Sequence, residues 1–251
     1  MRAFNIATFH MGRSGSSVLG SLLNQHPGIF WDYELFSPGR TQVIADRGVP
    51  SVLMRFPMTV LYLRMLRVGK KGYGFETQLS QLELLDMNLA QYIQRLQRLK
   101  FGHFIIIERK NQLRRIVSTV IGRKTLKWHK RADEAPSRPE RITLDTDCLQ
   151  LGRDPEPRRL IFHLQREQER MQGLKQAFSD LRVLHLTYED DIAEDPKQAY
   201  RRVCKYVGVD CHDVSVRFSK TNPYNLRELL INFEEVKNAL SGTAFDWMVD
   251  A

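Results

Sequence analysis

The strongest constraint on the fold of this chain lies at its beginning, where an apolar run, a Gly/Ser-rich loop and a helical pattern follow one another. Residues 3–9 (AFNIATF) are mostly apolar, which predicts a short buried strand. Residues 17–25 place four apolar side chains on one face of a helix: Val18, Leu19, Leu22 and Leu23. Pro27 and Gly28 then end that helix. The segment is therefore expected to run from a buried strand through a tight loop into a helix.

The loop itself, HMGRSGSS, has the composition of an anion-binding site. Backbone N–H groups at a helix N-terminus have no partner within the helix, and the helix dipole favours negative charge there. Glycine lets the backbone approach an anion closely, serine hydroxyls donate hydrogen bonds, and the planar arginine cation can hold two oxygens at once. The candidate anion-binding residues are Gly12, Arg13, Ser14, Gly15, Ser16 and Ser17.

Two other interpretations of the loop have to be weighed. The loop is not a Walker A sequence, because that pattern needs GxxxxGK[ST] and no GK[ST] is present. A plain tight turn, capped by Ser16 or Ser17, would use the same residue types without binding anything. The sequence alone leaves that second interpretation open.

The middle of the chain continues the alternation of helices and strands. Residues 78–99 form an amphipathic pattern that predicts one helix, residues 103–108 (HFIIIE) predict an apolar strand, and residues 112–122 predict another helix. Residues 124–158 are polar, contain proline and show no period. We expect them to form a long surface excursion, of the kind that serves as a functional lid.

The last third of the chain returns to regular structure. Residues 160–178 carry a helical stripe of apolar side chains, residues 182–190 (RVLHLTYED) predict a strand and its exit, and residues 225–240 predict a final helix. Between them a helix begins at Asp195-Pro196 and ends at Gly208. Alternating strands and helices favour an α/β fold with a central parallel sheet flanked by helices, and no linker divides residues 1–251 into separate domains.

Composition narrows the class of protein. With 38 Lys and Arg against 29 Asp and Glu, the net charge of +9 indicates a polyanionic partner: nucleic acid, an anionic membrane or a phosphorylated small molecule. Residues 109–131 hold nine basic side chains and no acidic one. The three cysteines, Cys148, Cys204 and Cys211, are too few and too irregularly spaced for a disulfide framework or a zinc site. No metal site is expected.

Targeting signals are not recognisable in the sequence. The first residues, MRAFNIATFHMGRSG, lack the apolar core and cleavage site of a signal peptide. The longest apolar stretch, Val52 to Leu66, is interrupted by Arg55, Pro57 and Arg64, whereas a membrane span needs about 20 mostly apolar residues. We therefore expect a cytoplasmic enzyme.

The segment GRSGSSVLGSLLNQHP resembles the 5′-phosphosulfate loop of sulfotransferases that use PAPS (3′-phosphoadenosine 5′-phosphosulfate). It is most similar to the carbohydrate branch, including the bacterial Nod-factor, lipopolysaccharide and trehalose enzymes, which carry arginine in this loop. The resemblance implies a P-loop-like three-layer fold, PAPS as the sulfuryl donor and in-line transfer to an acceptor hydroxyl. Arg13 would then stabilise the charge that develops on the leaving phosphate oxygen.

The resemblance also implies an anchor for the nucleotide 3′-phosphate. The family has an arginine after a buried strand and a serine about eight positions further on. Here the strand leads into RKNQLRRIVS, so Arg109 with Ser118 is the preferred pair, and Lys110 is the alternative. A solvated basic helix would account for the same segment without a ligand.

Two later segments also match the family. LTYEDDIAEDP resembles its strand exit, which implies that Tyr188 lies near the nucleotide base, although a packed tyrosine is an equal alternative. KTNPYNLRELL resembles its C-terminal end, where Lys220 could contribute to the 3′-phosphate site or be a solvated lysine.

A sulfuryl transfer also needs a general base for the acceptor hydroxyl. FWDYELF follows the first helix, and relatives have a glutamate in this place, which Glu34 matches better than Asp32. His103 is a further candidate, because cytosolic family members use a histidine. The alternative is that Glu34 is a surface carboxylate that pairs with a nearby arginine and has no catalytic role.

The acceptor is less well defined by the sequence. The resemblance implies a carbohydrate or glycolipid, and Trp31, Tyr33 and Phe36 could stack on sugar rings or simply pack in the core. The apolar stretch 52–67, with interspersed arginines, could touch a membrane. The preferred interpretation of that stretch is a buried helix with arginines at its rim.

Two rival functions remain. A nucleotide kinase is opposed by the missing GK[ST] and by the lack of a convincing Mg²⁺-binding aspartate. A nucleic-acid-binding protein is suggested by the charge, but no zinc finger, helix-turn-helix or RNP motif is present.

Overall fold

The structure is a computed structural model that describes residues 4–37, 56–69, 71–135, 138–152 and 156–250. The chain divides into two compact units. Unit 1 consists of Met1–Glu108 and Leu174–Val216, and unit 2 consists of Arg109–Gly173 and Arg217–Ala251. Each unit has its own hydrophobic core, and the two are described separately.

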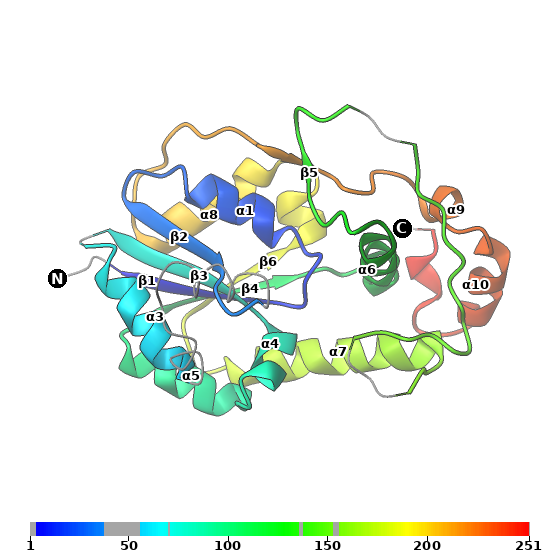
Figure 1. Cartoon of the computed structure of the whole chain (residues 1–251), viewed down its shortest axis with the longest axis horizontal. Coiled ribbons are helices and arrows are strands. Elements are labelled where there is room, and N and C mark those ends of the chain that lie inside the picture. Colours follow the sequence, from blue (N-terminus) through cyan, green and yellow to red (C-terminus); the bar gives the residue numbers. More distant parts are fainter. Residues whose placement is uncertain (1–3, 38–55, 70, 136–137, 153–155, 251) are drawn as a thin grey trace. The chain divides into compact units, whose positions relative to one another are not determined.

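Five parallel strands form the sheet of unit 1, in the order β2-β3-β1-β4-β6 (Figure 1). Their bounds are Asn5–His10 for β1, Ile29–Glu34 for β2, Gly72–Gln78 for β3, His103–Glu108 for β4 and Val183–Thr187 for β6. The strand order reverses at β1, which lies between β3 and β4. Open parallel sheets bind ligands beyond the carboxyl end of the strands at such a point. The loop that follows β1 therefore occupies the expected position of a ligand site.

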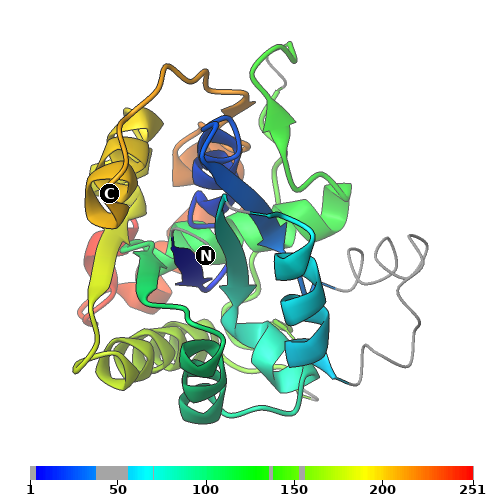
Figure 2. The same cartoon turned by 90° about the vertical axis from the view of Figure 1, so that its left-hand side faces the viewer.

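Helices cover both faces of this sheet. On one face α1 (Ser16–Leu23) and α8 (Pro196–Val207) share a core with Ile6 and Ile105 of the sheet. On the other face lie α3 (Pro57–Leu66) and α5 (Leu89–Arg98), where the Tyr92 ring meets Phe9 edge-on. In Figure 2, α8 and α3 lie on opposite sides of the sheet; α8 contacts β6, and α3 is drawn in cyan. The predicted three-layer α/β architecture is confirmed.

The single helix predicted over residues 78–99 is wrong. The segment forms two helices, α4 (Leu79–Leu84) and α5, separated by a turn. Asp86 in that turn has a positive φ of 48°, and the side chain of Asn88 accepts a hydrogen bond from the Gln91 amide at 2.9 Å. This cap starts a new helix. The apolar period continues across the break, which is why the pattern concealed it.

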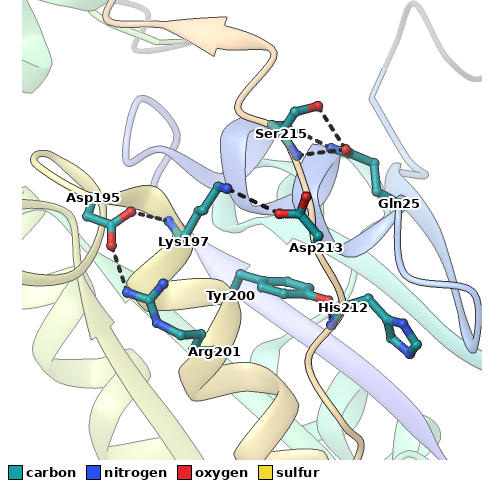
Figure 3. Close-up of polar contacts among 8 residues, drawn as sticks. All are labelled: Gln25, Asp195, Lys197, Tyr200, Arg201, His212, Asp213 and Ser215. Atoms are coloured by element: carbon teal, nitrogen blue, oxygen red, sulfur yellow. Dashed lines mark hydrogen bonds and ion pairs between the residues drawn. The ribbon is translucent and has the colours of Figure 1, made fainter.

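Residues 209–216, which follow α8 and belong to unit 1, form a segment without helix or strand. Gly208 ends α8 with a φ of 78°, as the sequence predicts. Further along, the His212 amide donates to the Tyr200 hydroxyl at 3.1 Å (Figure 3). The Gln25 side chain and the Ser215 backbone exchange two hydrogen bonds, at 2.9 and 3.0 Å. These contacts tie the segment to α8 and to the end of α1.

Unit 2 is built mainly from helices around one core. Its α-helices in the described part of the chain are α6 (Gln112–Thr125), α7 (Leu160–Ala177, whose last turn belongs to unit 1), α9 (Leu226–Leu229) and α10 (Phe233–Leu240), and a short 3-10 helix spans Asp246–Met248. The short strands β5 (Lys130–Arg131) and β7 (Phe218–Ser219) pair antiparallel. The final helix predicted over residues 225–240 is therefore wrong as one element. Leu230 separates α9 from α10 because its backbone is extended and bridges to Ile142.

The predicted surface excursion, residues 124–158, is corrected over part of its length. Ile142, Leu144 and Leu149 are at most 7% exposed and belong to the core of unit 2. Leu149 also bridges to Arg158. Residues 136–137 and 153–155 lie outside the described residues. Apart from the end of α6 and the short β5, the described part of the segment has irregular backbone held by isolated bridges. Such a segment has no period for a sequence pattern to reveal. Its role as a lid stays a prediction.

Helix α3 accounts for most of the apolar stretch 52–67, of which residues 52–55 lie outside the described residues. Val60, Leu61 and Met65 are buried, while Tyr62, Leu66 and other apolar side chains are exposed. The helix is therefore only half buried. Within the described ranges, no helix is both long and apolar enough to cross a membrane.

Candidate functional site

The loop between β1 and α1 has the backbone conformation of an anion-binding loop. Gly12, Arg13 and Gly15 have positive φ angles of 82°, 54° and 83°. Gly15 is the N-cap of α1, so no side chain caps this helix, and its first turn contains no acidic residue. Successive amides in such a conformation point into one concavity, where a helix dipole favours negative charge. The loop is therefore shaped to receive an anion.

Ser14 adds a second, independent observation. The residue is 1% exposed, and its buried hydroxyl oxygen has no hydrogen-bond partner among the residues that the structure describes. Leaving a buried hydroxyl unsatisfied costs about 1–3 kcal/mol. A ligand oxygen in the loop would satisfy it, so the residues present fit a phosphate- or sulfate-bearing group.

The sides of the loop are closely packed. A Cβ on Gly15 would lie 2.7 Å from Ile192 and 3.1 Å from the Tyr188 ring, and one on Gly12 would lie 2.8 Å from Gln78. Burial lowers the pKa of Arg13, and the nearby Tyr188 opposes this shift. The structure thus brings Tyr188 to the loop that the sequence singled out, and it explains both glycines by close approach.

Directly beneath the loop lies a cluster of three titratable side chains, His10, Glu34 and Glu76. The Nε2 atom of His10 is 3.5 Å from Oε2 of Glu76 and 3.9 Å from Oε1 of Glu34. His10 and Glu76 are almost completely buried, whereas the Glu34 side chain is 31% exposed. His10 ends β1, Glu34 ends β2 and Glu76 lies near the end of β3, so the carboxyl edge of the sheet gathers them.

Glu76 is held as a carboxylate by several donors. The indole nitrogen of Trp31 donates to its Oε1 at 2.7 Å. Burial by itself would raise the pKa of Glu76, but hydrogen bonds from His10, Trp31 and Ser16 hold the pKa below its usual range. Glu76 is therefore a fixed negative charge, not a group that exchanges protons near neutral pH.

Glu34 reaches the cluster through an irregularity in β2. Trp31 pairs with Gly74 and Glu34 pairs with Glu76, so β2 uses three steps where β3 uses two. Tyr33, in between, has a positive φ of 48°. Because side chains alternate along a strand, the extra residue places Glu34 on the same face as Trp31. Without this bulge Glu34 would point to the opposite face of the sheet.

The environment of Glu34 differs from that of Glu76. Burial raises its pKa, the charge of His10 opposes the shift, Glu76 adds to it, and a hydrogen bond from Gln81 at 2.9 Å opposes it. Two carboxyl groups with pKa values displaced in opposite directions are a pattern typical of acid–base sites. Glu34 is the member that can take up a proton, and it is the one that solvent reaches.

The same three side chains have the spacing of a possible metal site. The ligand atoms of His10, Glu34 and Glu76 lie within 4.8 Å of one another. However, the Gly12 amide donates to Nδ1 of His10 at 3.0 Å, so Nδ1 carries no proton. Histidine ligands usually donate a proton from the second ring nitrogen. A metal on Nε2 would therefore leave His10 without any ring proton, and the geometry favours a proton on Nε2.

The other two candidate bases lie elsewhere. Asp32 is fully buried, where it accepts two hydrogen bonds from Arg64, at 2.9 and 2.7 Å, and one from the Tyr73 hydroxyl at 2.8 Å. His103 begins β4 and pairs with Ile6, four residues before the end of β1. The structure therefore brings only Glu34 to the loop.

The three candidate sugar-stacking aromatics are largely accounted for by packing. Trp31 and Phe36 are each 2% exposed, and Tyr33 is half-buried at the bulge. Of these three residues, only Tyr33 is partly accessible.

Unit 2 contains the residues predicted to hold a 3′-phosphate. Arg109 follows the last residue of β4 directly, Lys110 is exposed, and Ser118 is a buried residue of α6. The side chain of Asn222 donates to the Ser118 hydroxyl at 3.4 Å. Ser118 thus lies beside the segment that follows Lys220, which is itself exposed.

Sequence reasoning missed His10, Glu76 and Gln81. One signal was available for Glu76, because it is the single charged residue in the strand GYGFETQ. Gly20 gives a second signal: it is a glycine inside a helix, and a Cβ there would lie 2.5 Å from Glu76 and 2.6 Å from Trp31. The contacts themselves join residues far apart in the chain, so no local pattern predicts them.

Comparison with known proteins finds a similar solved structure but no matching family. No protein-family model matches the chain, and no curated protein matches it significantly. Among solved structures the chain is similar to the crystal structure of mouse sulfotransferase SULT7A1 complexed with PAP, with 14% sequence identity and a TM-score of 0.45. The similarity covers 85% of this chain and 61% of that one, so this chain spans less than two thirds of its length.

Proposed function

We propose that this protein is a sulfotransferase that moves a sulfuryl group from PAPS to a hydroxyl of a carbohydrate or glycolipid. The observation that carries the proposal is the loop after β1, in which left-handed glycines, an uncapped helix and the unsatisfied Ser14 hydroxyl form an anion site. The resemblance of RSGSS to the phosphosulfate loop supports PAPS as the source of that anion. A cytoplasmic location is part of the same proposal.

The residues of the loop would bind the phosphosulfate group. The amides of the loop and the Arg13 guanidinium stabilise negative charge that builds on the phosphate oxygen as the sulfur–oxygen bond breaks. Tyr188, which lies against Gly15, would border the nucleotide base. In unit 2, Arg109 or Lys110 would bind the 3′-phosphate, together with Ser118 and Lys220.

Glu34 would act as the general base. The acceptor oxygen forms a bond to sulfur, its proton passes to the Glu34 carboxylate, and PAP (the desulfated nucleotide) leaves. The partial exposure of Glu34 lets an acceptor approach, and its raised pKa makes it a better proton acceptor than an ordinary surface glutamate. A general base of this kind contributes about 10²–10⁴-fold in rate.

Nucleotide binding provides the first test. Isothermal titration should show tight binding of PAP and no comparable binding of ATP with Mg²⁺. Ser14→Ala should weaken PAP binding, because it removes the unsatisfied donor, whereas Ser179→Ala, at an exposed position, should leave it unchanged. Tight binding of ATP with Mg²⁺ and none of PAP would instead indicate a kinase.

The acceptor requires a second test. The protein is incubated with labelled PAPS and a panel of glycans, glycolipids and phenols, and the product is identified by mass. Transfer to glycans or glycolipids supports the full proposal. Transfer to phenols alone would retain the sulfotransferase activity and exclude the carbohydrate acceptor.

A further inference from the structure

The first turn of α4 reaches the candidate base from the end of the neighbouring strand. Gln78 ends β3 and is the N-cap of α4, and Gln81 lies three residues further on, where it is 2% exposed. The Nε2 atom of Gln81 donates a hydrogen bond to Oε2 of Glu34 at 2.9 Å. A buried, neutral amide therefore contacts the more exposed of the two carboxylates in the cluster.

The orientation of the Gln81 amide is fixed from its other end. Gln78 and Gln81 form a capping box, in which each side chain accepts a hydrogen bond from the backbone N–H of the other residue. The Oε1 atom of Gln81 accepts from the Gln78 backbone at 3.3 Å. Because the oxygen is held there, the amide presents its N–H group to Glu34. The helix cap thus determines that Gln81 is a donor to the carboxylate.

Packing fixes the position of this turn. Leu79 and Leu82 of α4 are at most 8% exposed. The Nε2 atom of Gln78 donates to the carbonyl oxygen of Met11 at 3.4 Å, and a Cβ on Gly12 would lie 2.8 Å from the same nitrogen. The first turn of α4 is therefore anchored to the residues that follow β1 as well as to Glu34 at the end of β2.

Gln81 is the hydrogen-bond donor to the Glu34 carboxylate among the described residues. The other carboxylate oxygen, Oε1, lies 3.9 Å from Nε2 of His10, which is beyond hydrogen-bond distance. Oε2 is thus held in place, whereas Oε1 keeps its lone pairs available for a proton. With one oxygen fixed, the rotation of the carboxylate about its last side-chain bond is defined.

We infer that Gln81 is a positioning residue, which holds Oε2 of Glu34 so that Oε1 is left to take the proton of the acceptor hydroxyl. This role rests on the proposed function in one respect, namely that Glu34 is the base. Gln81 acts through Glu34 and not on the reacting atoms. A neutral amide suits the role, because it orients the carboxylate with a smaller loss of proton affinity than a lysine or arginine would cause.

The ionisation of Glu34 reports this contact. His10 from β1 and Glu76 from β3 are the titratable groups that face Glu34 among the described residues, and both remain when Gln81 is replaced. A hydrogen bond to the charged form of a carboxyl group lowers its pKa, so loss of the Gln81 donor should raise the pKa of Glu34 further. A base with a higher pKa is ionised only at higher pH, so the acid limb of kcat should move to higher pH.

Two substitutions separate the donor from the helix cap. Gln81→Met removes both hydrogen bonds of the side chain and keeps its length. Gln81→Glu keeps an oxygen that can accept from Gln78, as glutamate commonly does at this position of a capping box, but replaces the donor by a negative charge. Gln94→Met, at an exposed position of α5, is the control. Circular dichroism and thermal unfolding establish whether each variant is folded.

Both Gln81 variants should move the acid limb of kcat to higher pH. The expected displacement is about one pH unit for Gln81→Met, the order of one hydrogen bond to a charged group. It should be larger for Gln81→Glu, because a second carboxylate repels the charge of Glu34. Gln81→Met should also lower the plateau of kcat about tenfold and leave the Kd of PAP unchanged, and Gln94→Met should change none of these. An acid limb that stays in place in a folded Gln81 variant would overturn the inference.

A measurement on the free protein keeps the role of Gln81 separate from the proposed function. Carbon-13 NMR of glutamate-labelled protein reports the ionisation of Glu34 without any substrate, and Glu34→Gln assigns the signal. We expect Glu34 to titrate at higher pH in Gln81→Met than in the wild type, and the Gln81 side-chain amide signals of the wild type to follow the same titration. Identical titrations of Glu34, or amide signals that do not respond to it, would overturn the inference whatever the activity. An absence of sulfuryl transfer together with the displaced titration would overturn only the proposed function.

Discussion

Trp31 donates its indole N–H to Glu76 across a distance of 2.7 Å, and both side chains are at most 2% exposed. Trp31→Phe removes the donor and part of the packed volume, so a buried carboxylate loses one of its partners. We expect the free energy of unfolding to fall by about 2–4 kcal/mol in urea titrations. Trp247→Phe, at a position that is 51% exposed, is the control and should change it by less than about 0.5 kcal/mol. Equal losses in the two variants would contradict a role for the hydrogen bond.

Gly20 is a helix glycine that should resist replacement. Alanine normally stabilises a helix interior relative to glycine by about 0.5–1 kcal/mol. A Cβ at Gly20, however, would lie 2.5 Å from Glu76, so Gly20→Ala should destabilise the protein. Gly173→Ala in α7, where nothing lies within 4 Å, should be neutral or stabilising. Thermal unfolding of the two variants should therefore give shifts of opposite sign.

Substitution of Gly15 tests whether the loop between β1 and α1 binds the nucleotide. Gly15→Ala combines a positive φ with a contact of 2.7 Å to Ile192, whereas Gly208→Ala has a similar φ of 78° and nothing within 4 Å. The left-handed conformation alone costs about 1–2 kcal/mol. We expect Gly208→Ala to lose that amount and retain PAP binding, and Gly15→Ala to lose more stability and bind PAP poorly. Intact PAP binding by folded Gly15→Ala would mean that the loop does not contact the nucleotide.

The ion pair between Arg64 and Asp32 should be important for stability. Asp32 is fully buried, so Arg64→Met leaves an uncompensated buried charge, which costs about 3–5 kcal/mol. The pair between Arg201 and Asp195 is half exposed, and Arg201→Met should cost only about 0–1 kcal/mol. Urea unfolding distinguishes the two, and a small loss for Arg64→Met would show that Asp32 tolerates isolation.

Glu34 should set the acid limb of the pH–rate profile. A base must be ionised to act, and burial raises the pKa of Glu34, so turnover should rise with pH at higher values than for an ordinary glutamate. Glu34→Gln should lower kcat by about 10²–10⁴-fold and abolish this limb while leaving PAP affinity nearly unchanged. Near-normal turnover in Glu34→Gln would exclude it as the base.

Local patterns predicted the parts of the fold that depend on neighbouring residues. The strand and loop before α1, the strand at residues 103–108 and the limits of α8 at Asp195 and Gly208 all follow from period and capping. The breaks at Asn88 and Leu230 were missed because capping and bridging interrupt helices there without interrupting the apolar period. Periodicity reports which face is buried and not whether the helix is continuous.

The predictions for the site divide in the same way, into local features that the sequence reveals and long-range contacts that it does not. The loop residues and Glu34 were found from sequence, but the contacts that define their chemistry join separate strands. His10 is 66 residues from Glu76, and Gln81 is 47 residues from Glu34. The register of the parallel strands brings His10, Glu34 and Glu76 together, and Gln81 reaches Glu34 from α4, the helix that follows β3. Asp32 likewise is paired with Arg64, a residue of α3 that lies 32 positions away in the sequence.

Because of the bulge at Tyr33, the number of residues between Trp31 and Glu34 decides which face of the sheet the Glu34 carboxylate points to. Each residue inserted into or removed from β2 after Trp31 moves Glu34 to the other face of the sheet, so intermediate placements are not available. Substitutions of neighbouring residues can change the proton affinity of Glu34 gradually. A change of one residue in the length of β2, in contrast, either places the Glu34 carboxylate at the loop or removes it from there. Chains of similar fold that lack this extra residue would have to supply their base from another strand.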